Sequence, residues 1–180
     1  MTARFRRRGR AATARFTAAE AEVLRQVVGE IVDLMGGPDA GTDDPLAGLG
    51  TAPQVPDDPA LARLLPDGYR DDPPAAGELR RLTESSLRAD KVRNAQALLA
   101  ALPAGGGSVT LRGDDEQQAW LRALNDVRLA LGTRLDVTEE LDAAAEVAAD
   151  PGSARSYALV VYDWLGWLQE TLIRSVPLGR

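Results

Sequence analysis

The chain has 180 residues, of which 44% are hydrophobic and 27% are charged, a composition typical of one globular domain. It contains neither cysteine nor histidine. Disulfides, thiolate nucleophiles and iron–sulfur clusters are therefore excluded, and zinc, haem and Ser-His-Asp chemistry lack their usual side chains. We expect a non-enzymatic protein that uses no cofactor and no metal.

The net charge is −6, yet residues 1–15 hold six arginines and no acidic residue. This basic start lacks the apolar segment of a secretory signal. The longest uncharged run, residues 94–111, contains a proline and three consecutive glycines, which would break a helix crossing a bilayer. We therefore expect a cytoplasmic protein that makes no contact with membranes.

The spacing of apolar residues predicts a mostly α fold, with residues 1–180 forming one helical bundle and a small β patch at the start. An arginine-rich hairpin is expected over residues 1–16, with its turn near Gly9 and Arg10, and residues 108–112 form a β-prone piece that can pair with it. A capping box of Thr17 and Glu20 opens the first helix, which Gly36 ends. Further helices are expected over residues 59–65, 74–102, 114–131, 138–149 and 153–176.

Three details of these helices are specific enough to test. Gly132 is expected just after the end of one helix, and Thr138 is expected to cap the next. The inner face of the 74–102 helix is expected to carry Leu79, Leu82, Ser86, Ala89, Ala95, Leu98 and Leu102. Four aromatic residues crowd the last helix, and we expect them in the core, although Trp167 lies off the main stripe and suits a homodimer contact: Tyr157, Tyr162, Trp164 and Trp167.

Residues 36–74 form a connecting region rich in aspartate, proline and glycine, in which Asp-Asp-Pro recurs every 14 residues, at 43–45, 57–59 and 71–73. Paired carboxylates suit a hard cation, but no calcium-loop spacing is present. The favoured interpretation is that each second aspartate caps a helix whose first residue is the proline. Asp150 and Pro151 repeat the pattern.

The first candidate binding site is the arginine cluster at the start of the chain. Arginines at this density suit the phosphates of DNA or an acidic protein partner. The competing interpretation is a solvated edge hairpin whose charges prevent aggregation, or pairing of these charges with the acidic region at 39–72. The residues concerned are Arg4, Arg6, Arg7, Arg8 and Arg10.

The second candidate is a basic outer face of the 74–102 helix, which is too long for a helix-turn-helix unit. It is expected to be a solvated face, and it is also our hypothetical contact for a protein partner. Its residues are Arg80, Arg81, Arg88, Lys91 and Arg93.

A third group places polar side chains within an apolar helix, where asparagine and aspartate usually have a structural reason to be. We expect a buried polar network, with a ligand or partner site as the alternative. Its members are Asn125, Asp126, Arg128 and Arg134, and Arg122 is spaced to pair with Asp126.

Three stretches of the chain, residues 56–67, 121–134 and 162–170, resemble one actinobacterial family. The arginine-rich start and the segment Arg80-Arg81-Leu82-Thr83-Glu84 also fit that family. It was formerly called a domain of unknown function and is now named after the oxidative-stress regulator AosR. The likeness covers nearly the whole chain. It implies a cytoplasmic transcriptional regulator that answers oxidants, acting through a sigma factor or RNA polymerase. Thiol-based sensing needs a cysteine, so this member lacks that sensor.

The sequence thus supports a non-enzymatic regulatory protein that contacts the transcription machinery. Direct DNA binding through the N-terminal arginines is the alternative, and binding of an uncharacterised small ligand is the third hypothesis.

Overall fold

The computed structural model describes residues 1–36, 56–69 and 71–176, which contain six helices and three strands. The strands are β1 (Arg6–Arg8), β2 (Ala11–Phe16) and β3 (Gly107–Leu111). The helices are α1 (Ala18–Leu34), α2 (Pro59–Leu64), α3 (Pro73–Ala101), α4 (Asp114–Arg134), α5 (Ala143–Ala149) and α6 (Ala154–Ser175). The expected mostly α fold with a three-strand patch is confirmed.

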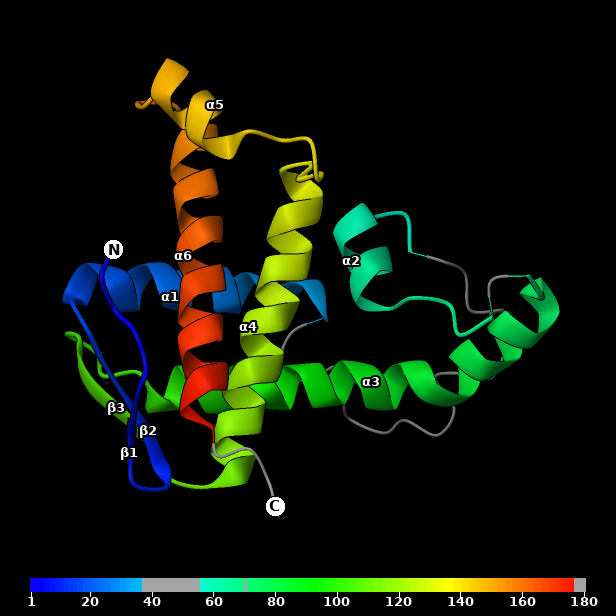
Figure 1. Ribbon diagram of the computed structural model, residues 1–180. Coiled ribbons are helices and arrows are strands. Elements are labelled where there is room, and N and C mark those ends of the chain that lie inside the picture. Colours follow the sequence, from blue (N-terminus) through cyan, green and yellow to red (C-terminus); the bar gives the residue numbers. More distant parts are fainter. Residues whose placement is uncertain (37–55, 70, 177–180) are drawn as a thin grey trace.

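The helices form two crossed layers (Figure 1). α4 and α6 run antiparallel in contact with each other, and α1 and α3 cross behind them. The sheet covers one end of this arrangement, α2 packs on α4 on the side away from α6, and α5 packs on the start of α6. Among the helices of the described ranges, none combines the length and apolar character that a membrane span requires.

The sheet is antiparallel in the order β1-β2-β3, so the β-prone piece after α3 does pair with the N-terminal hairpin. Because side chains alternate between the two faces of a strand, one face of the sheet is apolar and buried. Ala12, Ala14, Val109 and Leu111 supply that face. The opposite face is open to solvent.

The core is centred on Trp120, whose ring meets Phe5 edge to face at 5.4 Å between centroids and lies 6.1 Å from Phe16. Aromatic pairs at these separations add attraction beyond the area they bury. Fully buried leucines surround them from four helices: Leu24, Leu98, Leu124, Leu165 and Leu168. The sheet and the helices therefore share one hydrophobic core.

The start of α1 has the predicted capping box: Thr17 Oγ1 accepts from the Glu20 amide, and the Glu20 carboxylate accepts from the Thr17 amide. Glu20 also accepts hydrogen bonds from the amides of Thr2 and Ala3. Burial opposes ionisation of Glu20, but these backbone donors outweigh it and lower its pKa from 4.5 to about 2. One carboxylate thus fixes both the helix start and the N-terminal segment.

The aspartate–proline motifs behave as helix caps at two positions. Asp58 accepts from the amides of Ala60 and Leu61, and Asp72 accepts from the Ala75 amide. The repeat at 43–45 lies outside the described residues. At 150–151 the prediction was wrong, because Asp150 follows the end of α5 and Ser153 caps α6. Within the described residues, no group of three or more acidic side chains is arranged to hold a metal ion.

Two predicted helix boundaries were wrong. Gly132 lies inside α4, where a Cβ would stand 3.1 Å from the Tyr162 ring, so the glycine serves helix packing. The chain instead leaves α4 through Asp136, a residue with φ of 50°. The cap of α5 is Asp142, which accepts from the Ala145 amide, and Thr138 lies in a preceding turn.

The predicted inner face of α3 was wrong at its first half. Leu82 is 63% exposed and Ser86 is also exposed, because this part of α3 extends past α4 (Figure 1). Ala95, Leu98 and Leu102 are buried as predicted, where α3 crosses α1 and α4. The apolar spacing of a helix does not reveal where its neighbours end.

Candidate functional site

The expected basic face of α3 is neutralised by carboxylates of the same chain. Arg80, expected on the outer surface, is only 6% exposed, which corrects that placement. Its Nη2 donates to Asp67 Oδ1 at 2.6 Å and to the Leu65 carbonyl at 3.1 Å, and its Nη1 donates to Glu84 at 3.0 Å. Burial disfavours the charge, but these two carboxylates raise the pKa of Arg80 above its ordinary value. The segment after α2 covers this side of α3.

The other four cations of α3 are paired as well. Arg88 bonds Glu84 at 2.7 Å, and Arg81 bonds Glu78 at 2.6 Å. Arg93 pairs with Asp90, and Lys91 reaches across to Asp126 on α4 at 2.7 Å. The five residues therefore do not form one continuous basic surface. Their hypothetical role in partner binding remains a prediction.

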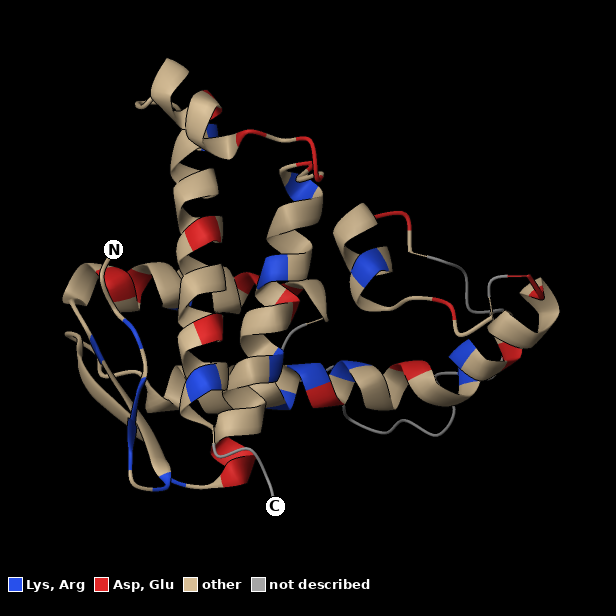
Figure 2. Ribbon diagram, viewed as in Figure 1, with Lys and Arg blue, Asp and Glu red and all other residues tan. Residues whose placement is uncertain are grey.

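The N-terminal arginines lie in a different electrostatic setting. Arg4, Arg6, Arg7, Arg8 and Arg10 are all exposed. Within the part of the chain that the structure describes, none of them forms an ion pair. Figure 2 shows this positive charge running along β1 and its turn, with no acidic residue on the three strands. The structure thus separates two groups of cations that the sequence alone ranked together.

The four polar residues expected to form one network contact three separate neighbours. Asp126 is buried and pairs with Lys91, and Arg134 bonds Glu30 on α1. Arg128 donates to Gln169 on α6 at 2.8 Å, and Asn125 is exposed. Successive residues of a helix point about 100° apart, so these side chains diverge. Asp126 pairs with Lys91 in place of the expected Arg122.

The aromatic residues of α6 divide between core and surface. Trp164 is buried, as predicted. Tyr157 and Trp167, by contrast, are 55% and 42% exposed, so the expectation that all four lie in the core was wrong. Asp163, Trp167 and Glu170 are spaced four and three residues apart, which places them on one side of the helix. This spacing in the sequence could have identified the exposed surface around Trp167.

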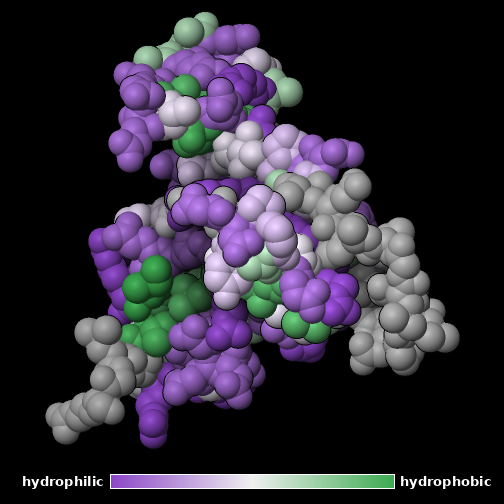
Figure 3. Space-filling model, turned by 90° about the vertical axis from the view of Figure 1, so that its right-hand side faces the viewer, coloured by the Kyte–Doolittle hydropathy of each residue, from purple (hydrophilic) through white to green (hydrophobic). Residues whose placement is uncertain are grey.

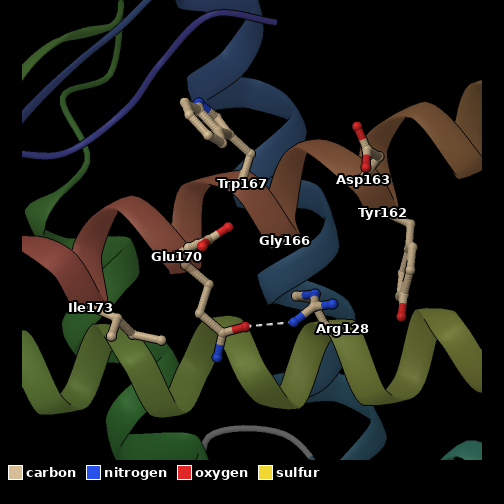
Figure 4. A pocket seen from close by; sticks show the side chains of 8 residues that line it. Arg128, Tyr162, Asp163, Gly166, Trp167, Glu170 and Ile173 are labelled. Carbon is tan, nitrogen blue, oxygen red and sulfur yellow. Dashed lines mark hydrogen bonds between the residues drawn. The ribbon is translucent and has the colours of Figure 1, made fainter.

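A groove lies along α6 beside Trp167. It has a volume of about 480 Å³. Figure 4 shows Tyr162 extending toward α4, while Asp163 and Trp167 point away from it. Eight residues line the groove: Arg128, Tyr162, Asp163, Gly166, Trp167, Gln169, Glu170 and Ile173. All but Ile173 belong to the stretches 121–134 and 162–170.

The groove has a rigid side and a freer side. The Arg128 guanidinium lies over the Tyr162 ring at 5.3 Å from its centroid and is tied to Gln169, so three side chains hold one another in place. On the other side, Trp167 exposes apolar surface between the carboxylates of Asp163 and Glu170, and Ile173 is exposed further along α6, beyond Glu170. Gln169 and Tyr162 were not among the predicted site residues.

A second groove of about 420 Å³ lies between α3 and α4, over the Lys91–Asp126 pair. Burial raises the pKa of Asp126, and the hydrogen bond and charge of Lys91 counteract this. Leu87 and Leu121 supply its apolar walls. Figure 3 shows that the side of the molecule bearing α2 and α3 is mainly hydrophilic where it is described, with apolar surface limited to small patches. The α6 groove therefore has the stronger features of a recognition site.

Comparison with known proteins agrees with the resemblance drawn from the sequence. The model of the family described as "Domain of unknown function (DUF2017)" matches residues 1–176. The "Oxidative stress regulator AosR" of Mycobacterium tuberculosis and that of Mycobacterium bovis are each 35% identical to this chain over 176 residues. Each alignment covers 86% of this chain and 77% of the relative. No solved structure matches the chain.

Proposed function

The chain belongs to the DUF2017 family, and from that premise we propose that it is a regulatory protein of the oxidative stress response. Two relatives, at 35% identity over most of the chain, carry the name oxidative stress regulator, which supports this role. The proposed action is non-enzymatic and cytoplasmic: the protein binds a sigma factor or an RNA polymerase subunit. The proposed contact surface is the α6 groove around Trp167.

The observation that carries this proposal is the cluster of Trp167, Tyr162 and Arg128 around one open groove. Tryptophan, tyrosine and arginine are the residue types that dominate hot spots of protein interfaces. Tyr162 and Arg128 are already held in place, so little side-chain freedom would be lost on binding. The Trp167 indole lies on the opposite rim of the groove, points away from α4 and is 42% exposed, which suits it as an anchor for a partner's apolar pocket.

The charges around the indole suggest the chemistry of the partner. Asp163 and Glu170 flank Trp167 along α6. Glu170 forms an ion pair with Arg174, with 2.5 Å between Glu170 Oε1 and Arg174 Nη2. A partner surface with an apolar depression bordered by basic side chains would complement this arrangement. Because the chain has no cysteine, the oxidant signal must reach this complex by a route other than a thiol of this protein.

The test is capture of partners from the native host's lysate by the tagged chain, with nuclease present to remove nucleic acid bridges. The wild type should recover a sigma factor or polymerase subunits, and Trp167→Ala should lose them. Tyr157→Ala is the matched control, because Tyr157 is an aromatic residue on α6 that is more exposed than Trp167 and lies outside the groove. With the purified partner, we expect Trp167→Ala to weaken binding by about 2 kcal/mol or more.

Equal recovery by both variants would contradict the proposed surface. Light scattering of the purified chain adds a separate outcome. A dimer that Trp167→Ala converts into a monomer would assign the groove to a second copy of the chain.

A further inference from the structure

We propose that the open face of the three-stranded sheet binds the phosphate backbone of nucleic acid without reading its sequence. This surface is separate from the α6 groove, and the inference does not depend on the proposed function. We name it the arginine–hydroxyl face and define it by six residues: Arg6, Arg8, Thr13, Arg15, Ser108 and Thr110.

The register of the strands places these residues on one side of the sheet. Thr13 pairs with Arg6 on β1 and with Thr110 on β3, and the two threonine hydroxyls lie 3.4 Å apart. Residues that face each other across antiparallel strands project to the same side. Arg15 pairs with Ser108, and because Arg15 is two residues from Thr13 on β2, this pair projects to the same side of the sheet. The residues between them, such as Ala12, Ala14 and Val109, form the buried side.

The chemistry of the face is uniform. Its polar side chains are guanidinium groups and hydroxyls, which donate hydrogen bonds to phosphate oxygens. The three arginines are exposed and form no ion pair with any residue that the structure describes. The exposed arginines of α3 differ, since Arg81 and Arg93 are each paired with a carboxylate three residues away. Most exposed arginines of the described surface that lack an ion pair thus gather on this sheet and its hairpin, whereas Arg63 on α2 and Arg122 on α4 stand apart (Figure 2).

The backbone beneath the face is held in place. The Ala3 amide donates to Glu20, and the Phe5 amide donates to Thr171 Oγ1 at 3.1 Å. Phe5 itself is buried against Trp120. Arg4 and Arg6 therefore extend from an anchored segment. Groups fixed in position before binding lose less freedom when a ligand arrives.

Nucleic acid fits this face better than a protein does. The face carries no aromatic or large apolar side chain, and such side chains supply the anchors of most protein interfaces. Arginine is the one side chain on the face that can read a base edge with two hydrogen bonds, and no asparagine, glutamine or acidic residue accompanies it to distinguish the other bases. Contacts to phosphate from arginine and hydroxyl groups position a duplex but specify no sequence.

The test is fluorescence anisotropy of the full chain with a labelled 20-base-pair duplex of mixed sequence, from 25 to 200 mM salt. The wild type should bind, and the logarithm of its association constant should fall linearly with the logarithm of the salt concentration. The slope should be about −0.9 for each phosphate contact. Arg6→Glu/Arg8→Glu should weaken binding at least tenfold at 50 mM salt and reduce that slope by about 2. A second duplex of unrelated sequence should bind within twofold of the first.

Arg81→Glu/Arg93→Glu is the matched control, because it changes the net charge equally at exposed arginines of α3. It should bind as the wild type does. If Arg6→Glu/Arg8→Glu loses helicity, Arg4→Glu/Arg15→Glu tests the same region. The proposal is overturned if the duplex does not bind at 25 mM salt or if the control loses as much affinity as the test variant. Tighter binding of poly-glutamate than of the duplex would also overturn it, in favour of an acidic protein.

Discussion

Lys91 Nζ lies 2.7 Å from Asp126 Oδ1 and joins α3 to α4. Both side chains are largely removed from solvent, with 13% and 6% of their surface exposed. Lys91 is the only lysine of the chain, and its compact charge neutralises a carboxylate that burial would otherwise penalise. The pair is therefore a structural link that also forms the floor of the groove between these helices.

Removal of Lys91 should be strongly destabilising, because it leaves the Asp126 carboxylate buried without a counter-charge. We expect Lys91→Met to lower the free energy of unfolding by about 3–5 kcal/mol, measured by urea denaturation at pH 7. Lys91→Met/Asp126→Asn should recover part of this loss, since the second change removes the unpaired charge. A double variant that is less stable than Lys91→Met would contradict this account.

Arg80 should contribute much more to stability than its neighbour Arg81. Arg80→Met leaves Asp67 and the Leu65 carbonyl without their donor and leaves Glu84 with Arg88 alone, and we expect a loss of about 2 kcal/mol. Arg81→Met removes an exposed pair with Glu78 and should cost about 0.5 kcal/mol or less. Urea denaturation of the two variants gives the comparison. Equal losses would mean that the burial of Arg80 has no energetic effect.

Glu20 should make the fold sensitive to acid. Its pKa in the folded chain, about 2, lies below its ordinary value of 4.5, so its stabilisation is complete above pH 4.5 and is lost as the pH falls toward 2. Glu20→Gln should lower the free energy of unfolding by about 2 kcal/mol at pH 7. The difference between the variant and the wild type should shrink steadily below pH 4.5. A difference independent of pH would show that the charge of Glu20 is unimportant.

Two adjacent glycines before β3 should respond differently to alanine. Gly106 has a φ of 78°, and a Cβ there would lie 2.6 Å from backbone atoms of Thr17 and Ala18. Gly106→Ala should therefore destabilise the fold by about 2 kcal/mol or more. At Gly105 a Cβ would have no neighbour within 4 Å, and Gly105→Ala should change stability by less than about 0.5 kcal/mol. Thermal unfolding followed by circular dichroism distinguishes the two.

Local sequence signals predicted those parts of the fold that depend on neighbouring residues. The Thr17–Glu20 capping box, the Asp58 and Asp72 caps and the Ser153 cap each satisfy backbone amides within three residues. Signals that depend on distant packing misled the prediction. Glycine is typical of a helix end, yet Gly132 lies inside α4. It is suited to that position because the ring of Tyr162, from α6, packs against it.

The candidate sites show the same division. The sequence identified the N-terminal arginines and placed Trp167 off the main apolar stripe of its helix. The pairs of Arg81, Arg88 and Arg93 with carboxylates three or four residues away follow from helical spacing. The sequence could not show that Arg80 meets Asp67 or that Lys91 meets Asp126, because these partners lie 13 and 35 residues apart. Nor could it show that Arg128 meets Tyr162 and Gln169, since this contact requires α4 and α6 to lie side by side.

By itself, the sequence determined the presence of the helices, four of their N-terminal caps (Thr17, Asp58, Asp72 and Ser153), the hairpin, the absence of thiol and imidazole chemistry, and the likeness to a regulator family. These follow from local hydrogen bonding, periodicity and composition, which act over a few residues or need no structure. Only the tertiary structure decided which charged groups are paired between elements that are distant in the chain. Pairing depends on distances of a few ångströms between elements far apart in the chain, because the attraction of two charges weakens with distance and with exposure to water.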